Sequence, residues 1–274
     1  MPGDPSAQRR RIFNRLEEFE TADRKQAGRL ILHRNCGLIG RWLLVSVAII
    51  LLPAWEAAAG GLKLPKTAAD PLSLYGPAID FDVFRKGDKV GFHRVRFERI
   101  GEDLIVSNTF QLEVHVLFFT AFRYVYHSEA RWRHGQLMSL KADVNDNGKS
   151  VSIDAVGEDG RMTVRNAVGQ FAVDAPLYPT NHWNAAVLPE TQVLNTLTGR
   201  INNVRIEPRG REEIATEWGD VAATRYAYTG DLAAEVWYDD VGRWVKLRFQ
   251  GRDGSDIDYV CRRCQGPTIK HAKQ

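Results

Sequence analysis

The chain has 274 residues, of which 44% are hydrophobic and 10% aromatic, so it can bury a sizeable core without a metal or a disulfide framework. Its net charge of +3 belongs to the first 59 residues, which hold 9 Lys and Arg against 6 Asp and Glu. Residues 60–274 hold 28 of each sign and lack the basic surface expected of a nucleic-acid-binding domain. These totals favour one large neutral domain and exclude nucleic acid as its predicted partner.

The N-terminal segment has the pattern of an export leader. Trp42–Leu52 is an 11-residue run without a charged side chain, and it follows Arg29, Arg34 and Arg41. A run of this length matches the core of a signal peptide, since a membrane span needs about 20 apolar residues. The segment Ala57–Ala59 supplies the small residues of a leader-peptidase site, with cleavage at its end. We therefore expect the mature protein in a bacterial-type periplasm.

About 40 residues precede this apolar run, which is more than an ordinary leader has. Either translation starts further along, near Leu30, or the extension is real and the segment is an uncleaved signal anchor with its basic side in the cytoplasm. The alternative location is thus an inner-membrane anchor with the domain in the periplasm. In both cases we expect membrane contact through the leader only. Residues 1–59 form the extension and leader, and residues 60–78, rich in Gly, Pro and Ala, are predicted to be a linker.

From Ile79 the sequence alternates between apolar and polar residues, the pattern of strands with one buried and one wet face. The turn signals between the alternating segments include Asn147–Gly148, which is typical of a tight hairpin. Strands joined by such short turns must be antiparallel neighbours. The predicted strands of this part are 79–83, 90–100, 104–116, 122–132, 137–144, 151–156, 162–167 and 170–173.

The alternation breaks at residues 176–197. Here Asn181 can cap a short helix at about 182–188, and residues 190–197 are predicted to add a second turn. The strand pattern then resumes, with predicted strands at 201–207, 213–216, 222–228, 235–238, 244–249 and 257–260.

About a dozen strands in one meander must curl, because accumulated twist bends a sheet of that width. The predicted fold class is therefore mainly β, an antiparallel meander curled into a barrel or half-barrel. It has one short helical insertion near 180–197. The barrel-like domain is expected at 79–260, followed by a polar tail at 261–274.

The segment Asp143–Gly148, with Asp154 at the twelfth position, resembles a calcium-binding loop in its oxygen ligands. Its flanks are predicted strands, and the last ligand would be Asp in place of the longer Glu. A hairpin turn explains the same residues, so no calcium site is predicted.

Acidic and histidine side chains on two neighbouring strands form a second candidate metal site. If those strands pair through a turn at 119–121, Glu113 faces His127, with His115 and Glu129 nearby. That register is an assumption, and a solvated outer face with opposite charges is the simpler interpretation. We predict neither a metal nor a cofactor.

Cys261 and Cys264 have the spacing of a dithiol. An exported protein meets an oxidising compartment, where this pair can form a local disulfide, the preferred interpretation. An intermolecular link and a metal or redox role are the alternatives. No predicted helix follows the first cysteine to lower its thiol pKa.

Several aromatic residues and one histidine are candidates for ligand binding. A run of rings in one strand could line an apolar cavity in a barrel, with core packing as the alternative. A further pair lies on the one long insertion, where it forms either a site or a plug that closes one end of the barrel. The candidate residues are Phe118, Phe119, Phe122, Tyr124, Tyr126, His182 and Trp183. No catalytic residue is predicted, because the sequence has no nucleophile elbow, zinc-binding helix, phosphate loop or dinucleotide fingerprint.

Several ordered segments resemble an uncharacterised family of exported bacterial β-rich proteins, known as a domain of unknown function. The resemblance covers about residues 79–260, and the long N-terminal extension and the cysteine-containing tail depart from it. It implies a periplasmic location and a barrel-like fold similar to lipoprotein-carrier half-barrels, and it supplies no catalytic residues. The matching segments are Phe81–Gly91, Pro179–Asn184, Thr229–Leu232, Trp237–Asp239, Gly242–Phe249 and Gly254–Tyr259.

Three hypotheses for function follow. The first is a non-enzymatic periplasmic binding or carrier protein for an apolar ligand such as a lipid. The second is a structural or accessory subunit of a cell-envelope complex, with an envelope protein as partner. An enzyme of unknown class comes third.

Overall fold

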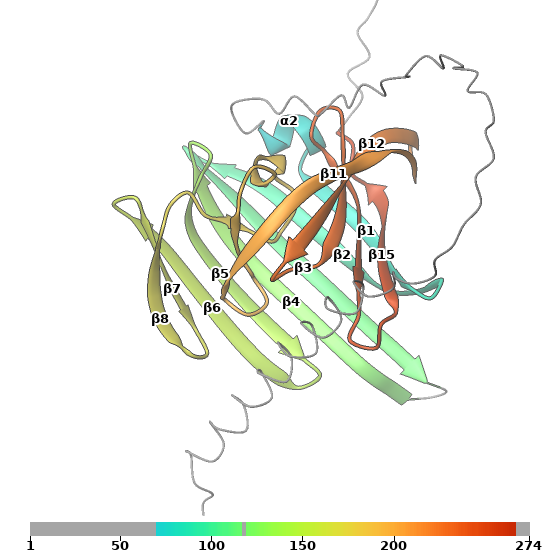
Figure 1. Ribbon diagram of the computed structural model, residues 1–274, viewed down its shortest axis with the longest axis horizontal. Coiled ribbons are helices and arrows are strands. Elements are labelled where there is room, and N and C mark those ends of the chain that lie inside the picture. The colour runs from blue at the N-terminus through green and yellow to red at the C-terminus, as the bar shows by residue number, and fades with distance from the viewer. Residues whose placement is uncertain (1–69, 117–118, 267–274) are drawn as a thin grey trace, which may run out of the picture. The chain divides into compact units, whose positions relative to one another are not determined.

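The structure is a computed structural model that describes residues 70–116 and 119–266 (Figure 1). These residues form one sheet of 15 strands in the order β8-β7-β6-β5-β4-β3-β2-β1-β15-β14-β13-β12-β11-β10-β9. The prediction of a mainly β, antiparallel fold is confirmed. The helical elements are α2 (Pro71–Tyr75) and the 3-10 turn η2 (Ala185–Val187). The strands are β1 (Ala78–Arg85), β2 (Asp88–Ile100), β3 (Asp103–Val116), β4 (Phe119–Arg133), β5 (Gln136–Asp146), β6 (Lys149–Glu158), β7 (Arg161–Asn166), β8 (Gly169–Asp174), β9 (Tyr178–Pro179), β10 (Gln192–Leu194), β11 (Ile201–Thr216), β12 (Gly219–Gly230), β13 (Ala234–Asp239), β14 (Trp244–Gln250) and β15 (Asp256–Arg263).

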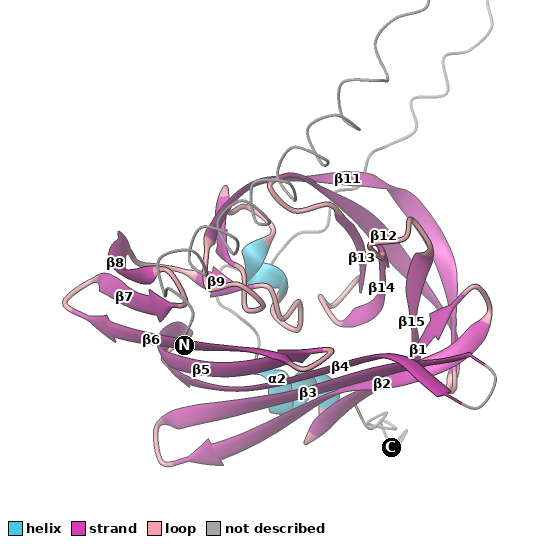
Figure 2. Ribbon diagram, turned by 90° about the horizontal axis from the view of Figure 1, so that it is seen from below, coloured by secondary structure: helices cyan, strands magenta, loops and turns pink. Residues whose placement is uncertain are grey.

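The sheet is open and curled, as a half-barrel is. Its two edges are β8 and β9, which follow each other in the chain. Strands β11–β15 curve over the part of the sheet that contains β2–β5, with β9 and η2 between the two parts (Figure 2). The side-chain amide of Asn166, in the β7–β8 hairpin, donates to the Gly199 carbonyl oxygen just before β11 at 2.9 Å. This contact ties the β8 side of the sheet to the segment that leads back into it.

The β5–β6 hairpin accounts for the calcium-like motif. Asn147 and Gly148 both have positive φ, 51° and 91°, as a tight two-residue turn requires. The Asp143 carboxylate accepts a hydrogen bond from the Ser152 hydroxyl at 2.6 Å, and Asn145 Oδ1 accepts one from the Gly148 N–H at 2.8 Å. The side-chain oxygens of the motif therefore make hydrogen bonds within the hairpin, which agrees with the hairpin interpretation of the sequence.

The register assumed for the second candidate metal site is wrong. Residues 117–118, which join β3 to β4, lie outside the described part, and Glu113 pairs with Arg123 while His127 pairs with Thr109. The Arg123 guanidinium lies 3.1 Å from the Glu113 carboxylate. Alternation predicts which face a residue takes, but the position of the turn sets its cross-strand partner.

Four differences from the predicted elements have local causes. The predicted strands 201–207 and 213–216 form one strand, β11, with a register shift between Pro208 and Arg211. The predicted second helical turn at 190–197 contains β10 instead, which is too short for an alternating pattern to reveal.

Asn184 caps the 3-10 turn in place of Asn181, because its side chain accepts from the Ala186 N–H at 3.0 Å. Helix α2 lies in the predicted linker and packs on the sheet through Tyr75, which is buried.

The predicted leader, residues 1–59, lies outside the described residues. Within the part of the chain that the structure describes, no helix combines the length and the apolar character needed to cross a membrane.

Candidate functional site

One end of the curved sheet is filled by residues 181–188, which we call the plug. Trp183 is 4% exposed, and its ring packs against Phe97 at 5.5 Å and Trp132 at 5.4 Å between ring centroids. The Tyr75 hydroxyl donates to the Trp183 carbonyl oxygen at 2.8 Å. Burial raises the pKa of Tyr75, which keeps this hydroxyl protonated and able to donate. Rings and hydrogen bonds together hold the plug, and we call this end of the sheet the closed end.

His182 has a backbone conformation that residues other than glycine rarely adopt, with φ at 57°. Its carbonyl oxygen accepts a hydrogen bond from the Tyr238 hydroxyl at 2.8 Å, and its ring contacts Tyr228 and Trp244 at 5.5 and 5.8 Å between centroids. Burial, together with a smaller effect of the nearby His93, lowers the pKa of His182 to about 3. The imidazole is therefore neutral near pH 7 and can act as a hydrogen-bonding group only.

A polar row crosses the interior from β2 to β4 beneath the plug. His93 Nε2 lies 3.4 Å from Asn108 Oδ1, and Asn108 Nδ2 donates to the Ser128 hydroxyl oxygen at 3.2 Å. Since the Asn108 oxygen faces the imidazole, His93 Nε2 is the donor of that contact. Burial lowers the pKa of His93 to about 4, and its Nδ1 has no hydrogen-bond partner among the described residues. The interior thus offers neutral hydrogen-bonding groups near pH 7.

Beside the polar row, on the side toward the start of β4, five side chains form a continuous line of rings on the inner face, which we call the aromatic row. Phe122 and Tyr124 of β4 have centroids 6.5 Å apart, and Tyr124 lies 5.8 Å from Phe110 of β3. Phe110 stacks on Tyr259 of β15 at 5.9 Å, and Phe249 of β14 lies 6.1 Å from Tyr259. Phe110 and Tyr259 are buried, whereas the other three rings are only partly covered. Several adjoining rings left partly exposed are typical of a binding surface.

Ion pairs tie the loop between β14 and β15 to other strands at the same end. Arg252 pairs with Asp146 at the end of β5, and Arg85 at the end of β1 pairs with Asp253. Arg85 Nε also donates to the Ser255 hydroxyl oxygen at 3.0 Å. Hydrogen bonds from Ser255, and then from Arg85, hold the pKa of the Asp253 carboxyl well below its usual range. We call the end that carries this loop and the aromatic row the mouth.

The predicted ligand residues fall into two groups. Phe122 and Tyr124 belong to the aromatic row at the mouth. Tyr126, two residues further along β4, is buried, and its hydroxyl donates to Asn181 Oδ1 at 3.0 Å. It therefore joins His182 and Trp183 at the closed end, where the plug interpretation of these two residues matches their burial and hydrogen bonds.

The side chains of two other predicted ligand residues lie outside the part of the chain that the structure describes. Phe118 lies outside the described residues. Phe119 begins β4, but its side chain lies outside the part that the structure describes.

Four inner-face residues were not among the predicted candidates: His93, Phe110, Phe249 and Tyr259. Each sits at a position where its strand alternates inward, so the period-two pattern marks all four as inward-facing. The pattern does not say which strands meet across the interior. The contact between Phe110 and Tyr259 joins strands three places apart in the sheet.

The last strand extends into the predicted polar tail, 261–274. Cys261 belongs to β15, and a disulfide joins it to Cys264, with both residues buried. Across residues 70–116 and 119–266, no group of three or more His, Cys, Asp or Glu side chains is arranged to hold a metal ion.

A hollow of about 260 Å³ lies on the outer face of β4 and β5. Arg123, Val125 and Asn145 line it, and these residues alternate with the inward-facing Tyr124 and Val144. The hollow is therefore on the opposite side of the sheet from the aromatic row.

Comparisons with known proteins point to a family and a fold. The model of a domain of unknown function, DUF6134, matches residues 81–262. A solved structure, the β-barrel-like protein of domain of unknown function DUF1849 from Brucella abortus, is similar at a TM-score of 0.50 and 12% sequence identity. The similarity covers 69% of this chain and 96% of that one, and at this identity it concerns the fold alone. No curated protein matches the chain.

Proposed function

This protein belongs to the DUF6134 family of domains of unknown function, and from that premise we propose that it is a non-enzymatic periplasmic binding or carrier protein for an apolar ligand such as a lipid. The observation that carries the proposal is the aromatic row, whose outer rings Phe122, Tyr124 and Phe249 remain partly exposed at the mouth. A half-barrel fold of this kind is suited to ligand binding in general.

The chemistry of the mouth fits an apolar chain. Aromatic side chains present 150–250 Å² each, and removing apolar area from water stabilises a complex by roughly 25 cal/mol per Å². Because Phe122, Tyr124 and Phe249 are already partly covered by the sheet, a ligand has to cover only their remaining faces. Burial raises the pKa of Tyr124, so this ring stays uncharged against an apolar ligand.

The plug determines from which end a ligand would enter. Trp183 packs between Phe97 and Trp132, so the rings of these three residues are buried at the closed end. At the mouth, ion pairs of Arg252 and Arg85 tie the loop between β14 and β15 to β5 and β1. Both arginines are partly exposed, and an exposed ion pair contributes only about 0–1 kcal/mol.

The test is native mass spectrometry of the protein purified from the periplasm of a bacterial host, followed by extraction of the bound species. We expect an apolar small molecule to copurify with the domain. Replacing Phe122 and Tyr124 by Ser should lower the bound fraction about tenfold, since two partly buried rings contribute more than 1 kcal/mol of contact.

The matched control replaces Val156 and Val168 by Ser, because both are apolar and exposed on other strands or turns. The control should retain the ligand. A protein that carries no small molecule, or that loses it equally in both variants, would contradict the proposal. A protein partner that copurifies at stoichiometric amount would favour the alternative, an accessory subunit of an envelope complex.

A further inference from the structure

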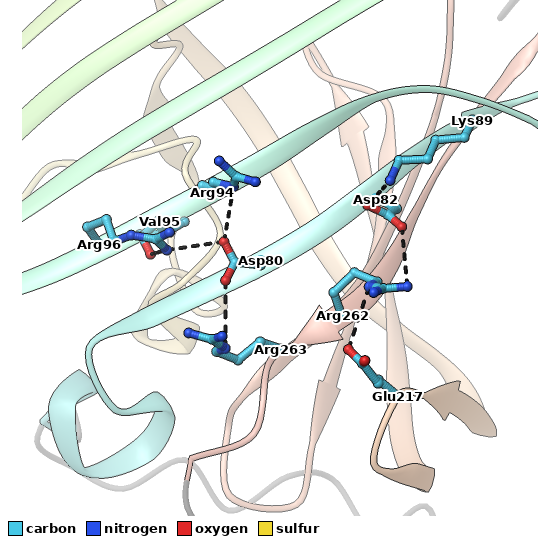
Figure 3. A network of polar contacts seen from close by, with 9 residues as sticks. All are labelled: Asp80, Asp82, Lys89, Arg94, Val95, Arg96, Glu217, Arg262 and Arg263. Atoms are coloured by element: carbon cyan, nitrogen blue, oxygen red, sulfur yellow. Dashed lines mark hydrogen bonds and ion pairs between the residues drawn. The ribbon is translucent and has the colours of Figure 1, made fainter.

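A cluster of basic side chains covers the outer face of β2, β1 and β15, and we call it the arginine patch: Lys89, Arg94, Arg96, Arg262 and Arg263. Figure 3 shows these side chains converging on two aspartates of β1. Their side chains are 51–56% exposed.

Three guanidinium groups share one carboxylate in this patch. Arg94 Nε, Arg96 Nη1 and Arg263 Nε lie 3.4, 3.1 and 3.7 Å from the carboxylate oxygens of Asp80 (Figure 3). Arg94 also stacks over the Phe92 ring at 4.5 Å, which orients it. One carboxylate cannot neutralise three cations, so two positive charges remain for a partner.

The second aspartate is part of a balanced group of two cations and two carboxylates. Asp82 lies 2.7 Å from Lys89 Nζ and 3.8 Å from Arg262 Nη1, and Arg262 Nε lies 3.5 Å from Glu217. The patch therefore holds five cations against three carboxylates.

The aspartates are also less exposed than the basic side chains around them. The side chains of Asp80 and Asp82 are only 20% and 14% exposed, whereas the basic side chains of the patch are about half exposed. A partner would therefore contact mainly the basic side chains. Next to the patch, Arg248 and Asp258 pair at 2.7 Å and cancel each other. The exposed Glu98 follows Arg96 on the same face of β2 and limits the patch there.

A β-bulge where β1 pairs with β15 places two neighbouring arginines of the patch on the outer face. Asp80 pairs with Arg263 and Phe81 with Cys261, so Arg262 is the extra residue of the bulge. As a result, two successive arginines are exposed, where regular alternation would turn one of them inward.

Apolar side chains lie exposed beside the patch. Trp218, in the β11–β12 turn, is 53% exposed, and together with Arg262 it lines one small surface depression. Val260, two residues before Arg262 on β15, is 42% exposed. A tryptophan next to arginines is typical of surfaces that sit at the headgroup level of a bilayer, where the ring enters the interface and the guanidinium groups bind phosphates.

We propose that the arginine patch, with Trp218 and Val260, docks the domain on a membrane surface rich in anionic phospholipid. Charge complementarity selects the anionic headgroup, and the adjacent exposed tryptophan selects a bilayer over a soluble anion. This goes beyond the sequence expectation that membrane contact runs through the leader only. It does not rest on the proposed apolar ligand, since the patch lies on the outer face and the aromatic row on the inner one.

The test is cosedimentation of the protein from Gly60 onward with vesicles. This form retains the sheet, because every described element and the core that these elements form lie within residues 70–266. Vesicles of phosphatidylcholine with phosphatidylglycerol should bind it at least about tenfold more strongly than phosphatidylcholine alone, and added salt should weaken the binding.

The decisive variant replaces Arg94, Arg96 and Arg263 by Ala, and we expect at least about a tenfold loss of binding to the anionic vesicles. The matched control replaces three other exposed arginines, Arg161, Arg165 and Arg205, and changes the net charge equally. The control should keep most of the binding. Equal loss in both variants, or equal binding to both kinds of vesicle, would overturn the proposal, and binding to an acidic protein alone would do so as well.

Fluorescence gives an independent measurement. Trp218 is the one exposed tryptophan of the described residues, because Trp132, Trp183, Trp237 and Trp244 are at most 4% exposed. Brominated lipids in anionic vesicles should therefore quench the protein, and Trp218→Phe should remove most of that quenching. Unchanged emission on vesicles, or quenching that survives in Trp218→Phe, would contradict docking through this surface.

Discussion

The two ends of the curved sheet use aromatic side chains in opposite ways. At the closed end Trp183 and Trp132 are buried against each other, and hydrogen bonds hold the plug in place. At the mouth Phe122 and Tyr124 contact each other but stay partly exposed. Strand β4 contributes to both ends, so the difference comes from the insertion, which fills one end only. A run of rings in a strand therefore locates an apolar surface but does not say whether the chain itself covers it.

The largest expected effect concerns stability at the closed end. Trp183→Ala should lower the free energy of unfolding by about 4 kcal/mol, since a buried tryptophan is lost and a cavity remains between Phe97 and Trp132. Urea unfolding followed by circular dichroism measures this. Phe122→Ala, at the mouth, is the comparison and should cost less than about half as much. Equal losses would show that the two ends are packed alike and would remove the contrast.

A smaller effect is expected where the sheet curves near the mouth. At Gly91, an added Cβ would lie 2.0 Å from the Gln111 carbonyl oxygen on β3. Gly91→Ala should therefore push β2 away from β3 and lower stability by about 2–3 kcal/mol. Gly87→Ala, in the β1–β2 turn, is the control, because nothing lies within 4 Å and only its φ of +88° is unfavourable. We expect about 1 kcal/mol there. A harmless Gly91→Ala would mean that the strands can separate freely at this point.

The third prediction concerns how the free energy of unfolding depends on pH through His93, which lies in the interior between the two ends. Burial lowers the pKa of His93 to about 4, below the value near 6.5 of an unfolded chain. Between pH 6.5 and pH 4 the His93 side chain is protonated in the unfolded state but neutral in the folded state. The free energy of unfolding is therefore highest above about pH 6.5 and falls as the pH is lowered toward 4. The loss from His93 should be on the order of 2 kcal/mol at pH 5.

Urea unfolding at pH 7 and pH 5 measures this dependence. His93→Gln should reduce the difference between the two pH values, even if it lowers stability at both. An undiminished difference in this variant would assign the effect to other groups, of which His182 is the nearest candidate because its pKa is lowered to about 3.

Local patterns in the sequence are enough to predict most of the strands and the faces of their side chains. Period-two alternation located the strand that carries Phe122, Tyr124 and Tyr126, and Asn147–Gly148 located a hairpin that the positive φ values confirm. These features depend on neighbours only a few residues away, which is why a pattern in the chain is enough to reveal them. The number of strands and their twist were likewise sufficient to indicate a curled sheet.

The residues that meet across the interior are known only from the folded sheet. The contact of Phe110 with Tyr259 depends on how tightly the sheet curls between β3 and β15, and the burial of Trp183 depends on where the insertion folds. The same holds on the outer face, where a bulge of one residue exposes both Arg262 and Arg263 beside Asp80. Such contacts join residues more than 50 positions apart, and their geometry is fixed by packing and register, which no local pattern encodes.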